Sequence, residues 1–203
     1  MMNPNEFWNQ AFGRSGLEPH YDDWLDKYKE ELDRCSGRTI LDLGCGIGNN
    51  AKYLTERGHK VLCCDQSEVA LEKLRAFVPE AETKRLNMLE GLSFADGSFP
   101  LVIADLSLHY FDEADTFRIV RDIHRVLEEG GLLLCRLNSI RSLPVYTGYY
   151  IEVGGLMRRY FDREQVDYYF GNDLWEKMTC LEYPMDRYFK GKIVWEVPAK
   201  KRG

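Results

Sequence analysis

The sequence predicts an α/β protein built on a mostly parallel sheet, and three observations carry this prediction. Apolar runs of strand length alternate with amphipathic helical segments from Thr39 to Asn138, and such alternation implies parallel strands joined by right-handed crossovers. A glycine-rich loop follows the first of these strands and leads directly into a helix. Beyond Asn138 the alternation of strands and helices stops, and the chain ends in two strand-like runs. We therefore expect about seven strands, helices on both faces and a C-terminal antiparallel hairpin.

The composition of the chain limits the classes of protein to which it can belong. The chain has 203 residues, of which 44% are hydrophobic and 30% charged, and its net charge is −6. These values are typical of a soluble globular protein and disfavour non-specific binding of nucleic acid. There is no run of 18 apolar residues, and the first residues lack the features of a signal peptide, so we expect no membrane association and a cytoplasmic location.

Cysteine and histidine usage argues against a metal site. None of the six cysteines forms a C-x-x-C pair, and the four histidines are scattered without the spacing of metal ligands. Most of the cysteines fall in or beside expected core strands, so buried free thiols are the expected state. No metal is predicted.

The N-terminal segment, Asn3 to Cys35, is expected to form two helices ahead of the sheet. Apolar residues recur there at three- and four-residue steps and make one stripe, which consists of Tyr21, Trp24, Leu25, Tyr28 and Leu32. A shorter aromatic patch comprises Phe7, Trp8 and Phe12. Such a patch is either part of the core or a lid over a ligand, and the sequence leaves both interpretations open.

The central elements follow from apolar periodicity and capping residues. Strands are expected at Thr39–Leu43, Lys60–Asp65, about Glu82–Leu86, Leu101–Leu108 and from Leu132 onward. Helices are expected at about Asn50–Arg57, from the cap Ser67 to before Pro79 with an apolar face ending at Phe77, and at Asp112–Glu129. Asn49 or Asn50 can cap the first helix, and the pair Gly130–Gly131 is expected to stop the third.

The last third of the chain is predicted to cover the sheet and to end in a hairpin. Residues 141–161 are rich in tyrosine and glycine without a clean period. Asp162 and Gln165 then form a capping box for a helix that runs through Phe170. The runs at 178–189 and 193–200, joined around Lys190–Lys192, predict the terminal hairpin.

The spacing of the glycines in the loop Ile40–Asn50 limits the classes of ligand that the loop can bind. In a G-x-G-x-x-G dinucleotide fingerprint counted from Gly44, the third glycine falls at position 49, where the chain has Asn49. This mismatch argues against a nicotinamide or flavin. The chain instead has D-x-G-x-G-x-G, with Asp42 at the end of the strand.

This pattern resembles motif I of class I S-adenosylmethionine-dependent methyltransferases. The resemblance continues with Asp65 at the end of the second strand, the loop at 86–99, the segment at 102–111 and the run from Arg125 to Gly131. It covers about residues 38–138. It implies a Rossmann-like fold and one methyltransferase domain over 1–203, with N-terminal helices at 1–37, the cofactor-binding core at 38–138 and covering structure with the hairpin at 139–203.

The resemblance implies S-adenosylmethionine as cofactor, with S-adenosylhomocysteine as product. Asp42 would attract the ammonium of its methionine part, Asp65 would accept both ribose hydroxyls, and Gln66 would flank the adenine. The family often has an acidic residue where this chain has Asn87, whose amide oxygen can accept the same hydrogen bond without charge. The expected cofactor-binding residues are Asp42, Gly44, Cys45, Gly46, Asn50, Asp65, Gln66, Asn87, Met88 and Asp105. For Asp105, capping a turn is an equal alternative.

The predicted function is methyl transfer to a small-molecule acceptor. Residues expected to meet the acceptor are Trp8, Tyr21, His109, Tyr110, Tyr149 and Tyr150. His109 is the candidate general base, with a purely structural role as its alternative. The alternative function is a non-catalytic module that binds S-adenosylmethionine or S-adenosylhomocysteine, and a nicotinamide-dependent oxidoreductase is the third possibility. The acceptor, the acceptor atom and the oligomeric state do not follow from the sequence.

Overall fold

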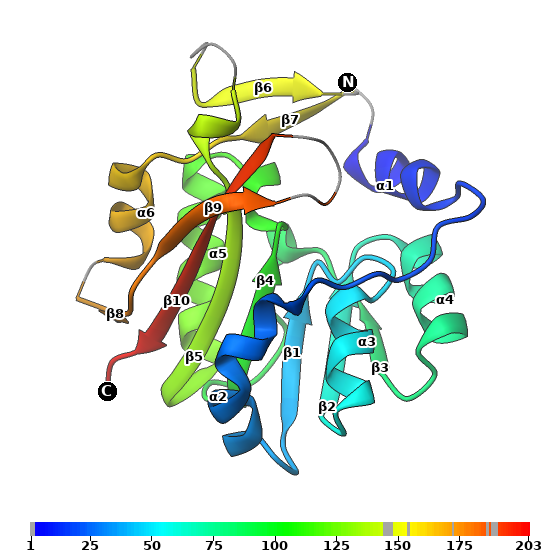
Figure 1. Cartoon of the computed structure of the whole chain (residues 1–203), viewed down its shortest axis with the longest axis horizontal. Coiled ribbons are helices and arrows are strands. Elements are labelled where there is room, and N and C mark those ends of the chain that lie inside the picture. Colours follow the sequence, from blue (N-terminus) through cyan, green and yellow to red (C-terminus); the bar gives the residue numbers. More distant parts are fainter. Residues whose placement is uncertain (1–2, 144–147, 154, 172, 186, 188–190) are drawn as a thin grey trace.

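A computed structural model of the chain describes residues 3–143, 148–153, 155–171, 173–185, 187 and 191–203. Within them, eight strands form one mixed sheet in the order β3-β2-β1-β4-β5-β10-β8, with β9 also paired to β10 (Figure 1). These strands are β1 (Thr39–Leu43), β2 (Lys60–Asp65), β3 (Glu82–Arg85), β4 (Phe99–Asp105), β5 (Leu127–Asn138), β8 (Trp175–Lys177), β9 (Leu181–Met185) and β10 (Lys192–Lys201).

The pairing confirms the predicted mostly parallel sheet. Strands β3, β2, β1, β4 and β5 are parallel neighbours, and β10 runs antiparallel to β5. The predicted C-terminal hairpin is β9 with β10, paired from Lys192↔Met185 to Glu196↔Leu181. Of the turn residues expected between them, Lys190 lies outside the described residues. A hairpin that the sequence did not predict, β6 (Tyr150–Val153) with β7 (Leu156–Arg159), lies within the segment 141–161.

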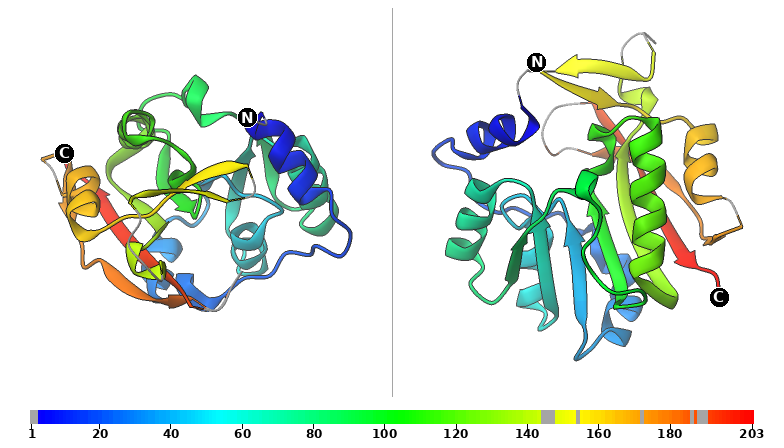
Figure 2. Two further views of the ribbon diagram at one scale, coloured as in Figure 1. Left: turned by 90° about the horizontal axis from the view of Figure 1, so that it is seen from above. Right: turned by 180° about the vertical axis from the view of Figure 1, so that it is seen from behind.

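Helices cover both faces of the sheet, as Figures 1 and 2 show. The helices α5 (Glu113–Val126) and α6 (Arg163–Phe170) lie on one face. The 3-10 helix η1 (Asp23–Tyr28) and the helices α2 (Lys29–Arg34), α3 (Asn49–Glu56) and α4 (Glu68–Phe77) lie on the other. In β1, Leu41 and Leu43 pack toward α5 whereas Ile40 packs toward α3. Burial on both faces explains the continuous apolar runs of the parallel strands.

Several predicted boundaries are wrong for local reasons. The run Leu101–Leu108 is not one strand, because Leu106 has a φ of 56° and ends it, and a 3-10 turn, η3 (Leu108–Tyr110), follows. The glycine pair does not stop a helix. α5 ends at Val126, and the pair lies inside β5, where the pairing with β4 shifts between Phe99 and Leu101.

Three expectations about helices also need correction. The N-terminal apolar stripe is carried by η1 followed by α2, with Tyr21 ahead of both. The cap of α3 is Gly48 in a left-handed conformation, not Asn49 or Asn50. Phe77 is 44% exposed because it is the last residue of α4, and Val78 takes the buried position beside it.

The remaining N-terminal helix, α1 (Pro4–Phe12), stands apart from the core. None of its residues is buried, and Figure 1 shows it above α4 near the upper edge of the sheet. Asn9 of α1 accepts a hydrogen bond of 2.7 Å from the Ser67 hydroxyl ahead of α4. α1 is therefore a cover attached to the edge of the domain. The core interpretation of the Phe7, Trp8 and Phe12 patch is wrong.

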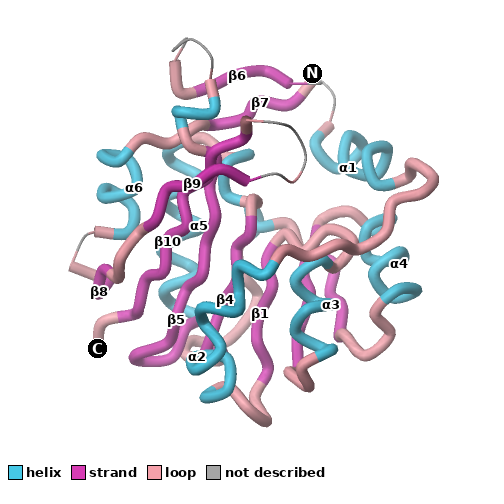
Figure 3. The backbone as a smooth tube through the Cα atoms, viewed as in Figure 1, coloured by secondary structure: helices cyan, strands magenta, loops and turns pink. Residues whose placement is uncertain are grey.

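Figure 3 shows β1 and β4 side by side, with β9, β6 and β7 above their upper ends. All six cysteines are free, and every one except Cys180 is buried, which confirms the expected buried thiols. Within the described residues no group of three or more His, Cys, Asp or Glu side chains is placed to hold a metal ion. No helix in the described part of the chain is long and apolar enough to span a bilayer.

Candidate functional site

A cavity of about 1180 Å³ lies at the carboxyl ends of the parallel strands. The strand order reverses between β1 and β4, and ligands of open α/β sheets bind at such a switch point. Lining residues come from the loop after β1, the ends of β2 and β4, the turns η2 (Met88–Glu90) and η3, and also from α1 and β7. Segments distant in sequence thus meet over one edge of the sheet.

The glycine loop forms one end of this cavity. Gly44 has a φ of 72°, and a Cβ there would lie 2.4 Å from the Ser107 Cβ, so the loop needs glycine to approach the segment after β4. The Gly46 amide donates a 2.9 Å hydrogen bond to Asp65 Oδ2. We call Gly44, Gly46, Asp65 and Asn87 the glycine end of the cavity.

Asp42 lies buried beneath the glycine loop and does not itself line the cavity. Neither of its carboxylate oxygens has a hydrogen-bond partner among the described residues. Burial, together with the charge of Asp105, raises the pKa of Asp42 to about 8, and the side chain of Asn50 opposes this shift. A buried carboxyl without a partner is costly to ionise, so the site is suited to a cationic group that approaches Asp42.

Asp65 is held in place by backbone donors. Its Oδ1 accepts from the Ser67 amide at 2.9 Å, and Oδ2 accepts from Gly46. Burial raises the pKa of Asp65, and these backbone hydrogen bonds act in the opposite direction. Since each carboxylate oxygen has two acceptor sites, Asp65 retains capacity for hydroxyl donors from the cavity that it lines.

Gln66, Asn87 and Met88 line the cavity beside Asp65. The Asn87 side chain already has local partners. Its Oδ1 accepts from the Leu89 amide at 3.1 Å, and its Nδ2 donates to Glu90 at 3.2 Å. A ligand amino group would therefore share the Asn87 side-chain oxygen with the Leu89 amide at the start of η2.

Asp105 lines the cavity but is committed to an ion pair. Arg136 Nε donates to Asp105 Oδ1 at 2.7 Å and Nη2 donates to Oδ2 at 2.8 Å. Burial alone would raise the pKa of Asp105, but the Arg136 charge prevails and holds it at about 2. Asn50 and Arg187 also donate to Oδ2, at 3.5 and 3.2 Å. The expected contact of Asp105 with cofactor stays a prediction.

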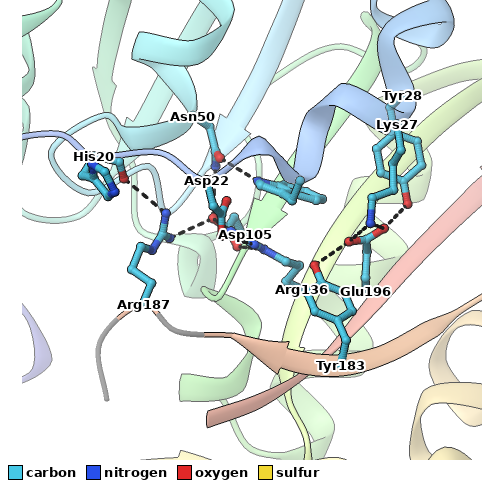
Figure 4. A network of polar contacts seen from close by, with 11 residues as sticks. His20, Asp22, Lys27, Tyr28, Asn50, Asp105, Arg136, Tyr183, Arg187 and Glu196 are labelled. Atoms are coloured by element: carbon cyan, nitrogen blue, oxygen red, sulfur yellow. Dashed lines mark hydrogen bonds and ion pairs between the residues drawn. The ribbon is translucent and has the colours of Figure 1, made fainter. Parts of the chain in front are cut away.

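Arg136 begins a polar network that sequence analysis missed (Figure 4). It is fully buried, donates to Asp22 at 2.7 Å and lies 4.4 Å from the Trp24 ring. Nearby, Glu196 of β10 accepts from the hydroxyls of Tyr28 and Tyr183, both at 2.6 Å. The Arg136 cluster joins the N-terminal segment to β4 and β5, and the Glu196 cluster joins it to β9 and β10. In the sequence, these clusters correspond to a charged residue within an apolar run, Arg136 in LLLCRLN and Glu196 in IVWEVPAK.

The expected acceptor residues divide into two groups. Trp8, His109 and Tyr110 line the cavity, with the Trp8 and Tyr110 rings edge to face at 4.8 Å. Phe12, whose ring lies 3.2 Å from a Cβ built on Gly46, lines it as well and supports the lid interpretation of α1.

Tyr21, Tyr149 and Tyr150 do not line the cavity. The Tyr21 hydroxyl bonds to Glu56, and the Tyr149 hydroxyl donates to Asp162 at 2.6 Å. Tyr150 is 39% exposed.

His109 faces basic side chains. It is buried, and its Nδ1 has no hydrogen-bond partner within the described residues. Burial and the charges of Lys192 and Arg158 keep its pKa well below the ordinary value, so the imidazole is neutral near pH 7. We call His109, Arg158 and Lys192 the basic end of the cavity. The sequence does not mark the two cations as site residues, because Arg158 falls in the segment 141–161 without a clean period and Lys192 falls in the turn of the predicted hairpin.

The switch-point cavity and its glycine loop define the protein as a nucleotide-cofactor-binding α/β protein. Residues 40–131 match the family model of the methyltransferase domain. The sequence is 37% identical over 103 residues to an uncharacterised methyltransferase of Synechocystis, covering 51% of this chain and 48% of that protein. It is 33% identical over 133 residues to a demethylmenaquinone methyltransferase of Lactococcus lactis, covering 62% and 52%.

A solved S-adenosylmethionine-dependent methyltransferase of Mesorhizobium loti has the same fold, with a TM-score of 0.69 and 22% identity over 88% of this chain and 97% of that one. Residues 40–131 thus resemble a methyltransferase domain, and the chain has the fold of class I S-adenosylmethionine-dependent methyltransferases. S-adenosylmethionine is the cofactor of that class. The chain spans about half the length of the curated relatives it matches.

Proposed function

We propose that this protein is an S-adenosylmethionine-dependent methyltransferase that acts on a small molecule. The observation that carries the proposal is the unpartnered Asp42 carboxyl beneath the glycine loop, which forms one end of a cavity of about 1180 Å³. Asp42 suits the ammonium of the cofactor, and Asp65 at the same end suits its ribose hydroxyls. The volume exceeds the roughly 300–1,000 Å³ of a typical ligand pocket, which leaves room for a second molecule.

The roles of the other residues follow from their places. Gly44 and Gly46 expose backbone at the glycine end, while Gln66, Asn87 and Met88 suit the adenine. When bound, S-adenosylmethionine supplies a methyl group on a sulfonium that is a good leaving group. The protein then has to orient the acceptor and exclude water, which Trp8 and Phe12 of α1 are placed to do. Neutral His109 can accept a proton from an acceptor that needs a base.

The segments that cover the cavity support the proposal that the acceptor is a small molecule. Lining residues come from α1 and β7 in addition to the sheet edge, so the cavity has walls on several sides. Its aromatic lining, Trp8, Phe12 and Tyr110, suits a partly apolar molecule. The name of the Lactococcus relative gives demethylmenaquinone, a small molecule, as its acceptor.

Two measurements test this proposal. Calorimetry with S-adenosylhomocysteine and with NADH should give a strong signal for the first and none for the second, because the glycine spacing lacks the dinucleotide fingerprint. The reverse result would overturn the proposal. A screen for S-adenosylhomocysteine release over a panel of N, O, S and carbon acceptors then tests catalysis. Binding without activity on any acceptor class would favour the non-catalytic binding module.

A further inference from the structure

The basic end of the cavity carries a concentration of positive charge that methyl transfer itself does not require. Arg158 stands on β7, Lys192 begins β10, and Arg187 lies between β9 and β10, and all three line the cavity. The elements that carry them come from the covering structure and not from the cofactor-binding core. Their convergence on one end of a cavity that also contains His109 indicates recognition of a ligand group.

The charges are close enough to act on one another. The strongest electrostatic influences on Lys192 among the described residues are one carboxylate, Asp105, and the guanidinium groups of Arg187, Arg136 and Arg158. Asp105 accepts two hydrogen bonds from Arg136, so much of its charge is already matched. Burial and the neighbouring guanidinium groups lower the pKa of Lys192 to about 7. Such surroundings favour the entry of an anion.

Arg158 supplies the second, independent observation. Its Nε is buried and has no hydrogen-bond partner among the described residues, and its guanidinium carbon lies 5.8 Å from the centre of the Tyr110 ring. An unsatisfied buried donor of a guanidinium is costly, and an oxyanion is its best partner. Tyr110 and Trp8 provide an aromatic surface next to it.

We propose that the methyl acceptor is a small carboxylate with an aromatic or apolar body, and that Arg158 and Lys192 bind its carboxylate at the basic end. This inference rests on the proposed function, since it names the class of acceptor. The guanidinium of Arg158 can pair with the planar carboxylate, and Lys192 adds a second charge. The aromatic body lies against Trp8 and Tyr110. The carboxylate end is then fixed, and the nucleophilic atom of the acceptor is directed toward the glycine end.

The test uses benzoate and its neutral isostere benzamide as probes. Each is titrated by calorimetry into the full chain saturated with S-adenosylhomocysteine, at constant ionic strength. Because hydrogen bonds to charged groups contribute about 1.5–3 kcal/mol, benzoate should bind at least about tenfold more tightly than benzamide. Arg158→Gln and Lys192→Met should each reduce this preference to about threefold or less. Arg163→Gln, at an exposed arginine of α6, is the matched control and should leave it unchanged.

The outcomes separate this inference from the proposed function. Equal binding of benzoate and benzamide, binding of neither, or a preference that survives in both variants would overturn the carboxylate site. Binding of S-adenosylhomocysteine to each variant, measured in parallel, reports that the variant is folded. If the wild type fails to bind S-adenosylhomocysteine, the proposed function fails. The benzoate titration of the ligand-free protein would still decide whether the basic end binds carboxylates.

Discussion

The two ends of the cavity are built in different ways. The glycine end comes from the ends of β1 and β2 and from the turn at Asn87, all within residues 40–90, and hydrogen bonds such as Gly46 to Asp65 span short stretches of chain. The basic end combines η3 of the core with β7 and β10 of the covering structure, which lie far apart in the sequence. It is supported by contacts such as Arg136 with Asp22, 114 residues apart. The proposed cofactor site is therefore a local feature of the core, whereas the proposed acceptor site depends on tertiary structure.

The largest expected effect comes from breaking the network under the basic end. Arg136→Met should lower the free energy of unfolding by about 3–5 kcal/mol, because Asp105 is left buried without its main partner. Chemical denaturation measures this change. The exposed control Arg163→Met should change stability by less than about 0.5 kcal/mol. An Arg136 variant as stable as the wild type would show that the N-terminal segment is held to the sheet in some other way.

The glycine end should respond mainly in affinity. Asp65→Ala removes the proposed acceptor of the ribose hydroxyls and should weaken S-adenosylhomocysteine binding at least about tenfold, since bonds to charged groups contribute about 1.5–3 kcal/mol. Calorimetry gives the affinity, and circular dichroism shows whether the variant is folded. Glu80→Ala, at an exposed acidic residue of the same domain, serves as control. Unchanged affinity in a folded Asp65 variant would remove Asp65 from the site.

The contrast between the two ends also explains what could be predicted from sequence. Local periodicity and capping set the bounds of β1 and β2 and the cap at Ser67, and the sequence predicts all three within a residue. Arg158 and Lys192 lie in segments whose placement depends on pairing with distant strands, so no local pattern marks them. Tyr149 and Tyr150 were expected at the acceptor because they follow the core. Their place in or beside a hairpin directs them elsewhere.

The smallest effect is expected at Tyr149, whose hydroxyl donates to Asp162 at the start of α6. Tyr149→Phe removes one hydrogen bond and should cost about 1 kcal/mol of stability, without changing the binding of S-adenosylhomocysteine or benzoate. Thermal unfolding measures the change in stability, and calorimetry measures the binding of the two ligands. A selective loss of benzoate binding would place Tyr149 at the acceptor and weaken the distinction between the cavity and its supporting structure.

The central claim is that the buried Asp42 carboxyl receives the ammonium of the cofactor. Because its pKa is raised to about 8, Asp42 is mostly protonated at pH 7, and its contribution to folding stability is lost as the pH rises toward and through about 8. A cation beside it favours the ionised form. Binding near pH 7 should therefore release about one proton and strengthen between pH 6 and 8.

Calorimetric titration of S-adenosylhomocysteine at pH 7 in two buffers of different ionisation enthalpy measures this proton directly. The account predicts release of about one proton from the wild type and none from Asp42→Asn, whose side chain does not titrate in this range. Binding to the wild type without proton release, or the same release from Asp42→Asn, would contradict it.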